Sequence, residues 1–175
     1  MNRWARLFRH RWMDRSDSLR AVPDDMAARL AARVRASESR HTGEVRLLVE
    51  AALPTSYVMR IGAPEPLASV VRDRALAWFG RLRLWDTELN NGVLIYLLLA
   101  EHAIEFVADR GLAQRVPPAE WEAMVGRLGQ RLRDGQFEDG LTQALEEVSA
   151  LLVAHFPAGG QTPAHNEQPD EVVRV

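Results

Sequence analysis

The sequence predicts an α/β fold, a three-layer α/β/α sandwich around a small mixed β-sheet in a single domain. The first observation is a run of nine apolar residues at 92–100, the most apolar in the chain. A bilayer span needs about twenty such residues, so this run is expected to be a buried central strand. The second observation is its context, because an alternating segment at 44–53 and an amphipathic helical pattern at 67–84 precede it. Strand, helix and strand in this order predict a crossover unit with two parallel strands.

The first 22 residues are expected to form a basic arm that carries tryptophan. Trp4, Phe8 and Trp12 recur at helical spacing, and arginines occupy much of the remaining sequence. One interpretation is an interfacial helix that contacts anionic lipid weakly through residues 1–15. The other is an arm whose tryptophans dock on the domain.

The domain is expected to span residues 23–157. A first helix is predicted over 24–39, because Pro23 and two acids are typical of a helix start. The strand predicted within 44–53 carries charge at alternate positions, which indicates partial cover and a place nearer the edge of the sheet than the run 92–100.

A second apolar segment, 103–108, follows the central run after only two residues. This spacing predicts a hairpin that turns at Glu101-His102 and pairs residue 94 with 109, which makes the sheet mixed. Two further helices are predicted at about 117–135 and 137–155 from their apolar stripes.

The sequence after the domain, 158–175, lacks an apolar period and is expected to be a disordered tail.

Composition excludes several function classes. The 175 residues carry a net charge of −2, with +5 in residues 1–40 and −7 in residues 41–175, so no field over the whole molecule favours nucleic acid. The absence of cysteine excludes disulfides and thiolate chemistry. No stretch reaches transmembrane length and no secretory signal is recognised, so a cytoplasmic protein is expected.

Oxygen-bearing side chains gather where the predicted hairpin returns to the start of the central strand. The candidate ligands at this rim are Asp86, Glu88, Asn90, Asn91 and Asp109. Such ligands suit Ca²⁺ or Mg²⁺ rather than a softer metal. His41 and Glu44 are candidate accessory residues at the same end of the sheet. The alternative is that these residues only cap helices and form turns. No sequence motif identifies a catalytic residue.

Four segments resemble the TPM domain family: 41–46, 85–95, 104–111 and 137–157. The resemblance covers roughly residues 24–157 and implies an α/β/α sandwich. Members of the family include a thylakoid-lumen protein described as an acid phosphatase and bacterial proteins that bind divalent metal. Many members have Asp-Asn-Gly where this sequence has Asn90-Asn91-Gly92, and the missing carboxylate counts against metal binding and phosphatase chemistry here.

The leading functional prediction is a non-catalytic module that binds a protein partner. One alternative is a phosphatase-like enzyme that depends on a divalent metal. A second alternative is a peripheral membrane protein held by its N-terminal arm.

Overall fold

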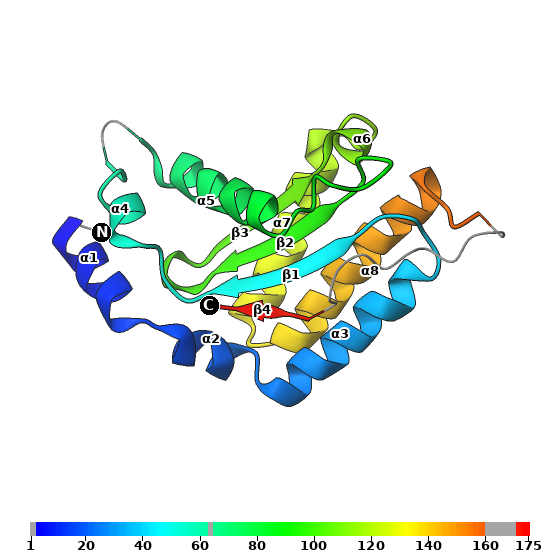
Figure 1. Ribbon diagram of the computed structural model, residues 1–175. Helices are drawn as coiled ribbons and strands as arrows, with labels where there is room; N and C mark the ends of the chain where they lie inside the picture. The colour runs from blue at the N-terminus through cyan, green and yellow to red at the C-terminus, as the bar shows by residue number, and fades with distance from the viewer. Residues whose placement is uncertain (1–2, 63–64, 160–170) are drawn as a thin grey trace.

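The computed structural model describes residues 3–62, 65–159 and 171–175, and these form an α/β/α sandwich (Figure 1). The sheet at its centre has four strands in the order β3-β2-β1-β4. Their bounds are β1 Val45–Glu50, β2 Val93–Leu98, β3 Ala103–Ala108 and β4 Val173–Arg174. The predicted fold class is confirmed.

Helices cover both faces of the sheet (Figure 1). One face is covered by α3 (Asp24–Glu38), α7 (Pro118–Arg133) and α8 (Phe137–His155), which pack on one another and on the strands. The other face is covered by α5 (Leu67–Arg81), which packs on β2 and β3. The shorter helices are α1 (Arg3–Trp12), α2 (Arg15–Ala21), α4 (Thr55–Val58) and α6 (Arg110–Ala113). Two hydrophobic clusters, one on each face, make up the core.

β1 and β2 are parallel, with Val45 opposite Val93, as the crossover pattern predicts. However, β1 is an inner strand between β2 and β4 and is buried along its whole length. Arg46 and Glu50 are only 4% and 3% exposed. The predicted place near the edge of the sheet is therefore wrong, because β1 pairs with a strand on each side and the carboxylate of Glu50 binds side chains of α5 instead of solvent.

The hairpin between β2 and β3 is longer at its turn than the sequence predicts. The strands pair Leu98 with Ala103 and Leu94 with Val107, so the predicted pairing of residue 94 with 109 is wrong by two positions. A 3₁₀ turn, η1 (Leu99–Glu101), and His102 in the left-handed conformation (φ 51°) occupy the difference. Apolar residues at 99 and 100 leave the strand, and hydrophobicity alone does not mark that boundary.

The end of the predicted tail belongs to the sheet. β4 pairs in parallel with β1, with Val173 opposite Leu48, and the amide of Ala51 donates to the carbonyl of Val175 at 2.7 Å. The prediction of a disordered segment at 158–175 is wrong for this part, while residues 160–170 lie outside the described chain.

Candidate functional site

The sequence-predicted rim is built where the 82–92 loop meets the end of β3. The amide of Asp109 donates to the carbonyl of Gly92 at 2.8 Å, and the amide of Gly111 donates to that of Asn90 at 2.9 Å. Both glycines permit close backbone approach. A Cβ at Gly92 would lie 2.0 Å from the carbonyl oxygen of Leu84, and a Cβ at Gly111 would lie 2.5 Å from the carbonyl oxygen of Leu89.

Asn91 and Asp109 are held at this junction by hydrogen bonds that involve only some of their polar atoms. Asn91 is 1% exposed; its Nδ2 donates to Thr42 Oγ1 at 3.1 Å, and its backbone amide donates to Thr87 Oγ1 at 3.0 Å. Asp109 Oδ1 accepts from the amide of Arg110 at 2.7 Å and caps α6. The other oxygens, Asn91 Oδ1 and Asp109 Oδ2, are buried and accept no hydrogen bond from the residues that the structure describes.

The remaining rim residues are placed differently. Asn90 adopts the left-handed conformation (φ 52°), and its Oδ1 accepts from Arg110 Nε at 3.0 Å, which fits a turn residue. Asp86 and Glu88 are exposed on the loop. Within residues 3–62, 65–159 and 171–175, no group of three or more His, Cys, Asp or Glu side chains is arranged to hold a metal ion.

His41 is completely buried, and the next residue along the chain, Thr42, contacts Asn91 of the rim. Burial lowers the pKa of His41 from 6.5 to about 4, although the backbone of Gly43 acts in the opposite direction. The imidazole is therefore neutral at pH 7. Glu44 is half-buried, and its carbonyl accepts the amide of Val93 where β1 and β2 begin.

A buried polar cluster beneath α5 was missed by the sequence analysis. Arg74 Nε donates to both carboxylate oxygens of Glu50, at 3.1 and 3.0 Å, and Tyr96 and Trp78 donate to the same carboxylate at 2.7 and 3.0 Å. The guanidinium of Arg74 also stacks on the rings of Tyr57 and Trp78, 5.1 and 5.0 Å from their centroids. Burial lowers the pKa of Arg74, but the hydrogen bonds that Arg74 donates to Glu50 and the negative charge of that carboxylate act together in the opposite direction, and the net shift is upward. The sequence feature that could have indicated this cluster is the carboxylate of Glu50 in a largely apolar strand.

Helix α1 presents its aromatic residues to solvent. Trp4, Phe8 and Trp12 are 73%, 63% and 81% exposed, and their spacing of four places them on one side of the helix. The interpretation in which these tryptophans dock on the domain is therefore wrong.

The polar side of α1 fixes it to the domain. His10 Nδ1 accepts the amide of Leu53 at 2.9 Å, so the ring proton lies on Nε2, which contacts Glu101 Oε1 at 2.9 Å. Arg6 Nε donates to the same oxygen at 2.8 Å, and Arg9 donates to the carbonyl of Ala100. The side chains of His10 and Glu101 are 3% and 4% exposed, so α1 is anchored through buried polar contacts.

Comparison with known proteins identifies the family. The family profile described as the TPM domain matches residues 16–151. The chain belongs to the TPM domain family. The NMR structure of the BA42 protein from the psychrophilic bacterium Bizionia argentinensis is similar to this TPM domain, with a TM-score of 0.72 over 88% of this chain and 95% of that one. The sequence identity is 23%, so this likeness shows the fold alone. No curated protein matches the chain.

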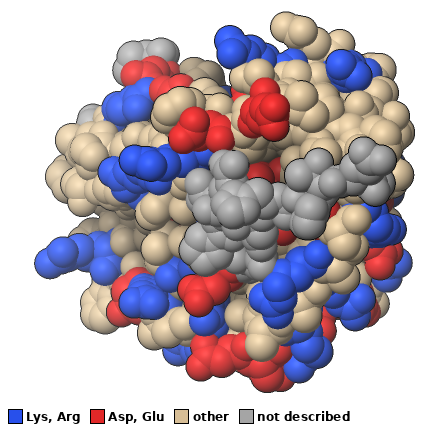
Figure 2. Space-filling model, turned by 45° about the vertical axis from the view of Figure 1, so that its right-hand side comes forward, with Lys and Arg blue, Asp and Glu red and all other residues tan. Residues whose placement is uncertain are grey.

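The surface and the helices of this TPM domain give two further observations. On the face seen in Figure 2, basic and acidic side chains are interspersed. No helix in the described parts of the chain has both the length and the apolar character of a membrane span.

Proposed function

We propose that this protein is a non-catalytic, cytoplasmic TPM domain that works as an interaction module and binds an anionic membrane surface through α1. The observation that carries the proposal is the exposure of Trp4, Phe8 and Trp12 on a helix whose other side is anchored in the domain. Aromatic rings of this kind insert at the boundary between headgroups and acyl chains.

The charge of the arm favours a lipid surface over an apolar groove of a protein. Arg11 and Arg15 are exposed next to Trp12, and the arm, residues 1–22, carries six arginines and two aspartates, a net charge of +4. Each arginine near an anionic surface contributes about 1 kcal/mol of attraction. A ten-residue helix with a single aromatic row inserts little apolar area, so we expect weak and reversible binding.

The test is co-sedimentation of the full chain with phosphatidylglycerol vesicles at low salt. We expect the full chain to bind. The double variant Trp4→Ala/Trp12→Ala should bind at least about tenfold more weakly, because it loses most of the inserted apolar area. The matched control is Trp85→Ala, since Trp85 is also exposed, at 54%, but lies outside α1. The proposal fails if the full chain does not bind these vesicles or if the double variant binds as well as the parent. A partner protein with an apolar groove would then be the better candidate for contacting the aromatic side chains of α1.

A divalent-cation site with phosphatase-like chemistry is the second candidate. The specific observation in its favour is the pair of buried oxygens, Asn91 Oδ1 and Asp109 Oδ2, that accept no hydrogen bond from described residues. Asp86, Glu88 and Asn90 supply further oxygen atoms on the neighbouring loop, and Ca²⁺ and Mg²⁺ prefer such ligands.

This candidate is tested by calorimetric titration with Ca²⁺ and with Mg²⁺, together with hydrolysis of p-nitrophenyl phosphate. Asp109→Asn retains a side-chain oxygen that can cap α6 but removes the charge, so it should abolish metal binding without unfolding the protein. The control Asp134→Asn changes an exposed acid outside the rim. If neither ion produces heat with the parent protein, the cation site is excluded.

A further inference from the structure

Strand β3 leaves one edge of the sheet open. It is an outer strand, and no strand of the described chain lies beyond it. Because the amide of Asp109 donates to the carbonyl of Gly92, the alternation of the antiparallel ladder can be followed along β3. This alternation directs the backbone N–H and C=O groups of Ile104, Phe106 and Ala108 away from β2, toward the open edge.

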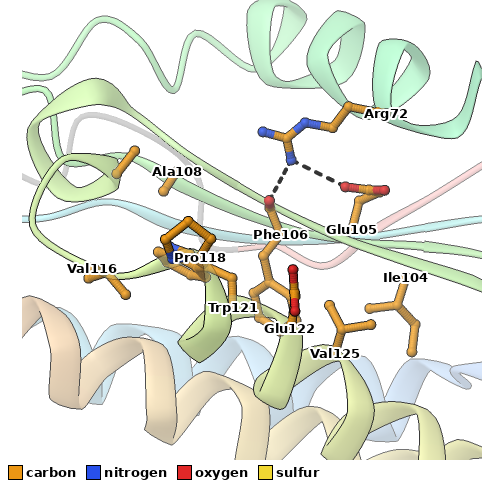
Figure 3. Close-up of a pocket in the computed structure, with 11 residues that line it drawn as sticks. Arg72, Ile104, Glu105, Phe106, Ala108, Val116, Pro118, Trp121, Glu122 and Val125 are labelled. Atoms are coloured by element: carbon orange, nitrogen blue, oxygen red, sulfur yellow. Dashed lines mark hydrogen bonds and ion pairs between the residues drawn. The ribbon is translucent and has the colours of Figure 1, made fainter. Parts of the chain in front are cut away.

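A pocket of about 450 Å³ lies against this edge (Figure 3). Arg72 of α5 and Glu105 line it from one face of the sheet, and Trp121 and Val125 of α7 line it from the other. Phe106 also lines the pocket, and its ring lies 6.0 Å from that of Trp121, centroid to centroid. The pocket therefore occupies the place that a fifth strand would take beside β3.

A second pocket, of about 600 Å³, continues along β3 and shares Ile104 and Val125 with the first. Gly126 and Gly129 of α7 contribute to its lining. A glycine within a helix costs about 1 kcal/mol relative to alanine. A Cβ at Gly126 would meet no atom within 4 Å, so packing within the chain does not require this glycine, and its lack of a side chain leaves the pocket open.

We propose that the β3 edge binds an extended segment of a partner protein as an added strand, with apolar residues at alternate positions. The outward backbone groups recur every second residue, and this pattern is complementary to another extended chain. Side chains two residues apart in a strand are about 6.6–6.8 Å apart and point to the same face. Two of them can therefore enter the two adjoining pockets on the α7 side. This inference does not depend on membrane binding by α1.

The residue between the two apolar positions faces α5, and its chemistry is set by Arg72. Arg72 Nη1 donates to the carbonyl of Phe106 at 2.7 Å and pairs with Glu105 at 3.2 Å. The Arg72 side chain is 43% exposed, so an incoming strand can displace it from the carbonyl. An acidic residue at the middle position of the segment can accept the hydrogen bond that this guanidinium no longer donates to the carbonyl of Phe106.

The experiment is a selection from a display library of random ten-residue peptides on the full-length protein. The enriched peptides should alternate apolar and polar residues, with an acid between two apolar positions. Gly126→Leu fills the second pocket and should weaken their binding about tenfold or more. Gly80→Leu is the matched control, because Gly80 is also an exposed helical glycine whose Cβ would meet nothing within 4 Å. Thermal unfolding of both variants checks that they remain folded.

Two readouts report the backbone pairing itself. Bound peptide should slow hydrogen exchange at the amides of Ile104, Phe106 and Ala108. Methylation of single backbone nitrogens of the peptide should abolish binding when the nitrogen belongs to every second residue, the set that pairs with β3, and should leave binding intact at the residues between. The inference is overturned if no peptide is enriched, if Gly126→Leu binds as well as Gly80→Leu, or if exchange slows elsewhere. It is also overturned if the free protein dimerises with these three amides already protected, because a second copy would then be the occupant.

Discussion

Glu50 holds together side chains from α5 and β2 on one face of the sheet. In Glu50→Ala the guanidinium of Arg74, whose side chain is 7% exposed, loses its carboxylate partner, and Tyr96 and Trp78 lose their acceptor. Leaving a buried charge unpaired costs about 3–5 kcal/mol of unfolding free energy. Chemical denaturation measures this loss.

The matched control is Glu147→Ala, which breaks the pair with Arg127 on the protein surface. An exposed pair contributes about 0–1 kcal/mol, so this variant should unfold nearly like the parent. Equal losses in the two variants would contradict the structural role assigned to Glu50.

His41 should make stability depend on pH. The pKa of His41 in the folded protein, about 4, lies below the ordinary 6.5. Between these two pH values the ring is therefore protonated in the unfolded chain and neutral in the folded chain. The contribution of His41 is complete above pH 6.5 and is lost as the pH falls toward 4, by roughly 3 kcal/mol. Denaturation of the parent and of His41→Gln at pH 4.5 and 7 tests this, and the variant should lose less stability on acidification. Equal losses in both proteins would rule out the role.

At this scale the sequence shows which residues are polar but not how their charges are neutralised. The carboxylate of Glu50 accepts hydrogen bonds from side chains of α5 and β2, and His41 is buried in a backbone bridge with the distant Pro157; no local pattern encodes those contacts. The sequence did predict the neighbourhood of Asn91 and Asp109 despite an error of two residues in the hairpin register, because the junction is closed by backbone bonds at Gly92 and Asn90.

At the scale of elements, β4 should stabilise the open side of β1. Deleting residues 171–175 removes the backbone pairing of Val175 with Val49 and Ala51, and it also removes the buried side chain of Val172, which is 7% exposed in the fold. Burial of a valine contributes about 1.5–3 kcal/mol, and we expect a loss of unfolding free energy of that size. Hydrogen exchange at the amide of Ala51 should accelerate in parallel. The control Glu171→Ala alters an exposed side chain and should do neither.

Elements with a long apolar period were predictable, and those made by pairing at a distance were not. The predicted helix 137–155 and strand 103–108 match α8 and β3 residue for residue, because each carries its own periodicity. β4 contains only Val173 and Arg174, too few residues to show a period, and exists because β1 offers it a partner.

At the scale of the whole molecule, charge is separated along the chain. Residues 1–22 carry +4 and residues 23–175 carry −6, so an anionic surface should attract the arm and repel much of the domain. The Debye length falls from about 10 Å at 0.1 M salt to about 3 Å at 1 M. We therefore expect the affinity for vesicles to fall several-fold over this range. Weak binding through the aromatic rings should remain at high salt. Co-sedimentation across the salt series measures this, and an affinity that does not change would contradict the electrostatic part of the proposal.

The four glycines at 80, 92, 111 and 126 should have different fates in a saturation-mutagenesis library. Gly92 and Gly111 abut backbone carbonyls, so sorting for folded protein alone should retain glycine at both codons. The same sorting should enrich alanine at Gly80 and Gly126, where a methyl group touches nothing and the helix gains. A second round sorted for capture of an extended peptide should then exclude bulky replacements at Gly126 but accept them at Gly80, so that one population of cells distinguishes a glycine kept for architecture from one kept for recognition.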